Sequence, residues 1–99
     1  MSMTVVVTRD VEARYRGFLS SAMLEVSPGV YVATRLSSGC REQVWAVLSE
    51  WYGYLGQGAI SMLWPDSSAD SGLQVRILGS PPRVPVLIDG ALLMHRPGS

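Results

Sequence analysis

Hydrophobic and polar positions along the chain predict an alternation of strands and helices. Residues 3–8 are nearly all β-branched or apolar, which is typical of a central strand buried on both faces. An apolar stripe then repeats at helical spacing from Val11 to Met23, and Asp10 is in place to cap that helix at its N-terminus. The first strand is therefore expected to lead directly into a first helix.

Two short β-rich segments are expected to pair next. Residues 24–26 and 30–34 lie on either side of Pro28-Gly29, which is a strong turn signal. Two such segments around a turn of this kind are typical of a β-hairpin. The chain is therefore expected to return to the sheet as a hairpin after the first helix.

A second helix, two further strands and an apolar tail complete the pattern. Ser37 or Ser38 can cap the helix, whose apolar positions repeat from Val44 to Leu55, and the glycines from residue 53 onward are expected to end it. The remaining expected elements are a strand over residues 59–64, a polar loop over 65–72, an alternating strand over 73–79 and an apolar tail over 84–94 with a turn at Asp89-Gly90.

This order of elements predicts a ferredoxin-like α+β sandwich, in which two helices cover one face of a mainly antiparallel sheet. A chain of 99 residues is enough for one domain, so residues 1–99 are expected to form a single one. The tail over residues 84–94 is surplus to that core. We interpret it as a strand that pairs at a subunit interface and covers an unpaired sheet edge, so a homodimer is expected.

Composition narrows the classes of protein and of site. Apolar residues make up 47% of the chain and charged residues 16%, which excludes intrinsic disorder. All eight basic residues are arginines, and eight carboxylates balance them, so any nucleic-acid site must be a local patch. The single cysteine excludes an intramolecular disulfide. Because neither a signal peptide nor a membrane-spanning segment is evident, a cytoplasmic protein is expected.

Asp10 is the strongest candidate for a metal-binding or catalytic residue, because it lies where the first strand meets the first helix. A carboxylate at this place can hold Mg²⁺, which prefers oxygen ligands, and could then serve catalysis. The other interpretation is that Asp10 only caps the helix. One carboxylate alone is a weak metal site, and two copies across a dimer axis would bind better.

Three arginines are candidates for contact with a nucleic-acid backbone. Arg14 and Arg16 lie early in the first helix, and residues two apart on a helix point to nearly opposite sides of the apolar stripe. Arg83 follows Pro81-Pro82 on a stiffened loop. The alternative is that these arginines are only solvated surface residues. The three tryptophans are interpreted as packing residues.

Several strings of the sequence, taken in order, resemble the second CRISPR-associated protein in its subtype I-E form. Each string is weak alone, but the ordered set is specific and covers nearly the whole chain. The strings are Met1–Thr8, Arg14–Gly17, Leu24–Val26, Pro28–Val32, Arg41–Trp45 and Pro85–Gly90.

The resemblance implies a ferredoxin-like fold and a symmetric homodimer. It also implies a bridge between two dimers of the CRISPR integrase, the first CRISPR-associated protein, during insertion of short duplex DNA as new spacers. In such a complex this protein holds the DNA and the integrase carries the chemistry. By resemblance, Arg14, Arg16 and Arg83 match positions that hold the duplex backbone, and Asp89 matches an acidic position that docks the integrase.

Two departures from the family pattern bear on activity. The family was named for divalent-metal nuclease activity that uses an acid at the end of the first strand. Here that position is Arg9, and the acid follows one residue later, at Asp10, where a strand side chain would point to the opposite face. The family pattern has two basic residues before the last strand. Here those positions hold Pro82 and Arg83, so one of the two positive charges is missing.

These departures set the order of three functional interpretations. A dimeric DNA-binding scaffold in spacer acquisition is favoured. The alternative is a metal-dependent endonuclease acting on RNA or double-stranded DNA, with Mg²⁺ as cofactor and Asp10 as its catalytic and metal-binding residue. The third is an unrelated ferredoxin-like module that binds a metabolite.

Overall fold

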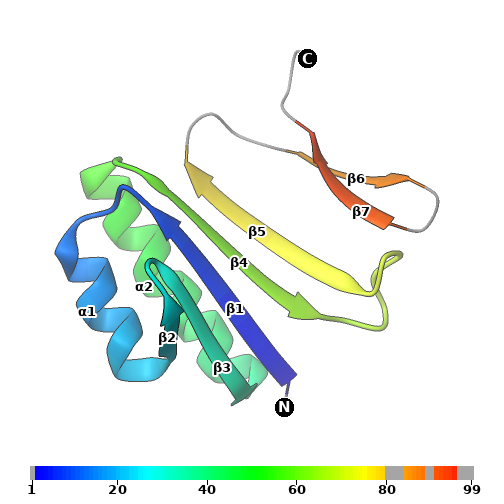
Figure 1. Ribbon diagram of the computed structural model, residues 1–99, viewed down its shortest axis with the longest axis horizontal. Helices are drawn as coiled ribbons and strands as arrows, with labels where there is room; N and C mark the ends of the chain where they lie inside the picture. The colour runs from blue at the N-terminus through cyan, green and yellow to red at the C-terminus, as the bar shows by residue number, and fades with distance from the viewer. Residues whose placement is uncertain (1, 80–83, 89–90, 96–99) are drawn as a thin grey trace.

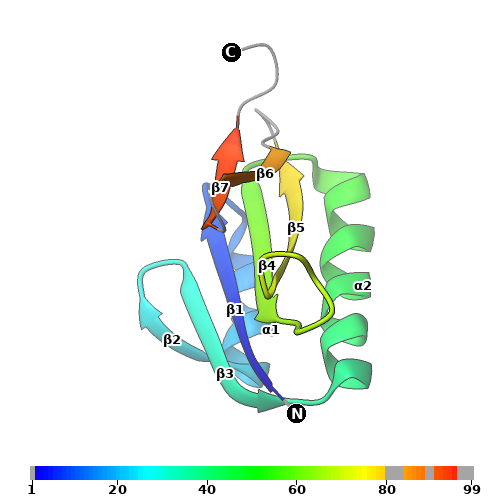
Figure 2. The same ribbon diagram turned by 90° about the vertical axis from the view of Figure 1, so that its right-hand side faces the viewer.

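A five-stranded antiparallel sheet with both helices on one face forms the body of the protein (Figure 1 and Figure 2). The structure, a computed structural model, describes residues 2–79, 84–88 and 91–95. The elements are β1 (Ser2–Arg9), α1 (Ala13–Ala22), β2 (Leu24–Ser27), β3 (Val30–Leu36), α2 (Ser38–Leu55), β4 (Ala59–Pro65), β5 (Leu73–Gly79), β6 (Val84–Ile88) and β7 (Ala91–His95). This arrangement confirms the predicted ferredoxin-like α+β sandwich.

The strand β1 lies at the centre of the sheet. The strand order is β2-β3-β1-β4-β5, and every neighbouring pair is antiparallel. The chain crosses from β1 to the outer strand β2 through α1, returns as β3, and crosses over β1 to β4 through α2. Two crossovers on the same side leave the opposite face of the sheet without helices (Figure 2).

The hydrophobic core fills the space between the helices and the sheet. Alternate strand residues point into it, since side chains on a strand change face at every position. The buried apolar side chains are Val6, Tyr15, Leu19, Met23, Tyr31, Val44, Leu48, Ile60, Met62 and Trp64. Trp45 and Trp51 pack against this cluster from α2, so the prediction that the tryptophans are packing residues is confirmed.

The prediction that β1 is buried on both faces is wrong for the single chain. Met3 and Val7 are 48% and 38% exposed, whereas Thr4 and Val6 between them are buried. The helices cover only one face of the sheet, so the other face of this β-branched strand remains accessible. We call that side the open face.

The open face carries an apolar row that crosses all five strands. Strand pairing aligns Val32 with both Leu24 and Val5, and aligns Leu63 with both Val5 and Val75. Cross-strand partners lie on the same face of a sheet. The row therefore continues from one edge of the sheet to the other.

The helix α2 begins and ends at local sequence signals. Ser37 Oγ accepts a hydrogen bond from the backbone N–H of Cys40 at 3.2 Å, as predicted for a capping serine. Gly56 adopts a left-handed φ of 60°, and its N–H donates to the Tyr52 carbonyl, which ends the helix at Leu55. Gly53 lies inside the helix, so it does not help to end it as predicted.

Within the part of the chain that the structure describes, no helix is long and apolar enough to cross a membrane.

The C-terminal segment contains two strands that pair with each other, where the sequence predicts one interface strand. β6 and β7 pair with each other in antiparallel register, from Val84 opposite His95 to Ile88 opposite Ala91. They make a two-stranded sheet that is separate from the five-stranded one. The predicted turn at Asp89-Gly90 lies outside the described residues. Arg83 and Asp89 lie outside the described residues, so their predicted roles stay predictions.

Candidate nucleic-acid interface

The junction between β1 and α1 departs from the predicted one. Asp10 has a left-handed backbone φ of 57°, and α1 begins only at Ala13, with Glu12 as the N-cap residue. Glu12 makes no side-chain capping bond. The interpretation that Asp10 caps the helix is therefore wrong, because two more residues are needed to turn the chain from the strand into the helix.

A glycine of the α2–β4 loop fixes one side of this junction. Gly58 has a φ of 82°, and a Cβ atom placed on it would lie 2.4 Å from the Arg9 carbonyl oxygen and 2.6 Å from that of Asp10. The Tyr52 hydroxyl donates a hydrogen bond to the Gly58 carbonyl at 3.0 Å. Only glycine allows so close an approach of two backbones, so the end of β1 is held against the loop after α2.

The β2–β3 turn fixes the other side of the junction. The backbone N–H and the side-chain hydroxyl of Thr8 both donate to the Gly29 carbonyl, at 2.7 and 3.0 Å. The Gly29 N–H in turn donates to Glu25 Oε2 at 3.1 Å. The segment that carries Asp10 therefore leaves the sheet between two hydrogen-bonded loops.

The structure brings Asp10 and Arg16 together at a shallow hollow of about 280 Å³. We call it the junction hollow. Its lining residues are Thr8, Asp10, Val11, Arg16, Pro28 and Gly29. Arg14 lies elsewhere on the helix, with its guanidinium carbon 5.5 Å from the ring centroid of Trp51 on α2. The two arginines thus flank the buried stripe of α1 on different sides, as their spacing predicts.

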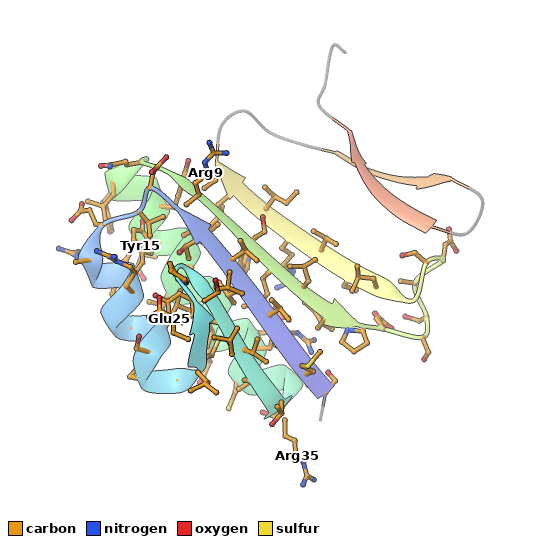
Figure 3. All side chains as sticks on the ribbon, in the orientation of Figure 1. Arg9, Tyr15, Glu25 and Arg35 are labelled. Atoms are coloured by element: carbon orange, nitrogen blue, oxygen red, sulfur yellow. The ribbon has the colours of Figure 1, made fainter. Side chains whose placement is uncertain are left out.

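Two neighbouring residues of opposite charge, Arg9 and Asp10, are exposed at the end of β1. Arg9 Nε lies 3.9 Å from Asp10 Oδ2, and both side chains are more than four-fifths exposed. Arg9 is aligned with Ala59 in the sheet and stands at the end opposite Arg35 (Figure 3). Among the described residues that line the junction hollow, Asp10 is the one carboxylate, and an arginine beside it opposes the binding of a divalent cation there.

The buried tyrosines of α1 and β3, Tyr15 and Tyr31, add no charge to the site. Burial raises the pKa of Tyr15, and the neighbouring Glu12 carboxylate raises it further. Burial likewise raises the pKa of Tyr31, followed by the effect of Glu25. Both hydroxyls stay neutral at neutral pH, so the positive charge on this part of α1 comes from its arginines.

Two other arginines are engaged in packing against Trp64. The guanidinium carbons of Arg41 and Arg76 lie 4.1 and 4.9 Å from the centroid of its indole ring. Arg76 also donates to Glu42 Oε1 at 2.7 Å, and this bond lowers the pKa of the Glu42 carboxyl group. These arginines join α2 to β4 and β5, which leaves them less available for a ligand than Arg14 and Arg16.

A comparison with protein families identifies the chain. Residues 3–93 match the family described as CRISPR-associated protein (Cas_Cas2CT1978). The chain belongs to this family. The matched range includes the β1–α1 junction, both helices and all five strands of the main sheet from residue 3 onward. The assignment of the chain to the subtype I-E form stays a prediction.

Sequence reasoning missed two residues that shape this interface. Gly58 is interpreted from the sequence only as part of a helix exit, although it is the contact point of the β1–α1 junction. Trp51 is interpreted only as core, although it also contacts Arg14. The only local signal for the role of Gly58 is weak: it is a second glycine, two residues beyond the Gly56 cap. No local pattern indicates that Trp51 contacts Arg14.

Proposed function

We propose that this protein is a dimeric scaffold of CRISPR adaptation that bridges integrase dimers and holds duplex DNA during spacer acquisition. The observation that carries the proposal is the pair of exposed arginines, Arg14 and Arg16, in the first turns of α1. Among the described residues, neither Arg14 nor Arg16 forms an ion pair with a carboxylate. Exposed guanidinium groups without acidic partners on a fixed helix are suited to backbone phosphates.

Membership of the CRISPR-associated family supports this proposal over a metabolite-binding module. The hollow beside Asp10 is shallow and is lined on one side by a turn. Small-molecule sites are usually deeper and largely apolar. A surface with two outward arginines fits a long, charged ligand better than a small one.

Cleavage is supported less well than binding. The family's acidic position holds Arg9, and Asp10 is exposed beside that guanidinium. Mg²⁺ binds through several oxygen ligands at once. Among the described residues, no group of three or more possible metal ligands includes Asp10, and a second copy of the chain would have to bring another carboxylate to strengthen the site. We therefore favour DNA retention over nuclease activity. If the protein is a nuclease instead, Asp10 is the residue proposed to bind its metal ion.

The homodimer is supported by the open face of the sheet. Its apolar row runs from Leu24 to Val75, and Leu24 is 69% exposed. Apolar patches of this extent on small proteins mark interaction surfaces. A second copy is the partner that the family resemblance implies, and the segment over residues 84–94 is proposed to contribute to the same interface.

Placing a charge on the open face is expected to separate the dimer. Val7→Glu would bury a carboxylate in the interface, so light scattering should give the mass of one chain. The matched control is Tyr54→Glu, which changes a 78% exposed side chain on α2. It should leave the dimer intact. Circular dichroism checks that both variants are folded, and a folded Val7→Glu protein that stays dimeric would contradict the proposed interface.

Association with the integrase tests the bridging role. We expect the purified dimer to bind a CRISPR integrase and to join two integrase dimers, which light scattering on the eluted complex would show. Adding duplex DNA should stabilise this complex because both proteins would contact the same backbone. A protein that binds neither the integrase nor the duplex, alone or together, would rule the scaffold role out.

A further inference from the structure

Trp51 stands at the contact between the two helices and beside Arg14. Its indole ring meets the ring of Tyr15 at a centroid distance of 5.6 Å and an angle of 74°. It meets the ring of Phe18 at 5.4 Å and 68°. Both are edge-to-face contacts, which aromatic pairs prefer. Two contacts from α1 therefore fix where the indole ring lies.

The same ring contacts the guanidinium group of Arg14. The guanidinium carbon lies 5.5 Å from the ring centroid, which is within the range of a cation–π interaction. An arginine can rest its flat face on a ring while the N–H groups around its edge stay free to donate. Contact with Trp51 is therefore compatible with simultaneous hydrogen bonds to a phosphate.

We propose that Trp51 is a positioning residue that holds Arg14 ready for a backbone phosphate. This rests on the proposed function, because it assumes that Arg14 contacts the duplex. A long exposed side chain normally loses much rotamer freedom when it binds a ligand. A ring that restricts Arg14 beforehand reduces that loss, so the duplex binds more tightly without any contact between Trp51 and DNA.

The other arginine of α1 provides an internal comparison. Within the described residues, no aromatic ring lies against the Arg16 guanidinium, which instead borders the junction hollow. Arg41 and Arg76 do contact Trp64, but Glu42 pairs with both of them. Arg14 is thus the exposed arginine of the site whose orientation depends on an aromatic side chain.

A double-mutant cycle separates positioning from general stability. Affinity for a labelled duplex is measured in the complex with the integrase, well below the melting temperature of each variant. Trp51→Leu is expected to weaken binding roughly five- to thirty-fold, the change that corresponds to two exposed cation–π contacts, one in each chain of the dimer. In an Arg14→Ala background the same substitution should have no further effect. In an Arg16→Ala background, Trp51→Leu should weaken binding by the same roughly five- to thirty-fold as in the natural protein.

Two further variants control for packing. Trp45→Leu removes a half-buried indole from the same helix. Within the described part of the chain, no arginine lies over the ring of Trp45. It should lower the melting temperature and leave affinity unchanged. Trp51→Phe keeps an aromatic face and should restore most of the binding that Trp51→Leu loses.

The outcomes distinguish the inference from the function on which it rests. If Arg14→Ala leaves duplex affinity unchanged, the proposed contact of Arg14 with DNA fails and the positioning role fails with it. If Arg14→Ala weakens binding but Trp51→Leu weakens it equally in both arginine backgrounds, only the positioning role is overturned. An equal loss for Trp45→Leu would also overturn it, because packing alone would then explain the effect.

Discussion

Replacing Gly58 with alanine is expected to lower the free energy of unfolding by roughly 2–4 kcal/mol. Part of this cost is the left-handed backbone, since Gly58 has a φ of 82°. The rest is the clash of the new Cβ atom, which would lie 2.4 Å from the Arg9 carbonyl oxygen and 2.6 Å from that of Asp10. Both are backbone atoms, which cannot rotate away as a flexible side chain could.

Two glycines of the same region are matched controls for this effect. Gly56 has a φ of 60°, but a Cβ atom placed on it would meet no atom within 4 Å, so its replacement should cost only about 1–2 kcal/mol. Gly53 lies in the helix with the same free space, and Gly53→Ala should stabilise by about 0.5–1 kcal/mol. Urea denaturation measures all three variants. If Gly58→Ala costs no more than Gly56→Ala, the close contact with the β1–α1 junction is not present in solution.

Replacing Arg16 with alanine is expected to make duplex binding less dependent on salt. Each arginine occurs twice in a dimer, so this variant removes two phosphate contacts if each guanidinium neutralises one phosphate. The logarithm of affinity falls with the logarithm of salt concentration at a slope near −0.9 per phosphate, so the slope should become shallower by about 2. The loss should be equal for unrelated sequences of the same length, because backbone contacts do not read bases.

The control for this measurement is Arg35→Ala, which makes the same change of charge at a distant place. Arg35 lies near the end of β3, whereas the junction hollow is beside the turn that precedes that strand (Figure 3). Its replacement should leave the slope unchanged in the complex with the integrase. If Arg16→Ala has the affinity and slope of the natural protein, or Arg35→Ala alters them as much, Arg16 is not part of the DNA site.

Acid is expected to weaken the ion pair near Trp64, because that pair depends on the ionised carboxylate of Glu42. A lowered pKa for Glu42 means that its contribution to stability is present at neutral pH and is lost as pH falls through that pKa. Glu42 is half exposed, so this contribution is small. The fold near the β1–α1 junction therefore does not rely on it.

Local patterns determined the elements and the order in which they occur. The helical stripe of α1 and the cap of α2 at Ser37 depend on residues within a few positions of one another, so the sequence predicts them directly. The opposite placement of Arg14 and Arg16 follows from helix geometry alone. The ferredoxin-like fold then follows from the order of strands and helices, because few sheet topologies accommodate it.

What covers each surface was decided only by the tertiary structure. The unbroken β-branched sequence of β1 indicates that both of its faces are apolar, but only the position of the helices shows that the face with Met3 and Val7 is accessible in the single chain. The start of α1 could not be predicted because Asp10 adopts a left-handed conformation between two loops that are distant in sequence. The contact of Arg14 with Trp51 joins two different helices, and no local pattern encodes a contact made by packing. The sequence therefore determines which residues carry charge, and the packing of α1 against α2 determines where that charge is held.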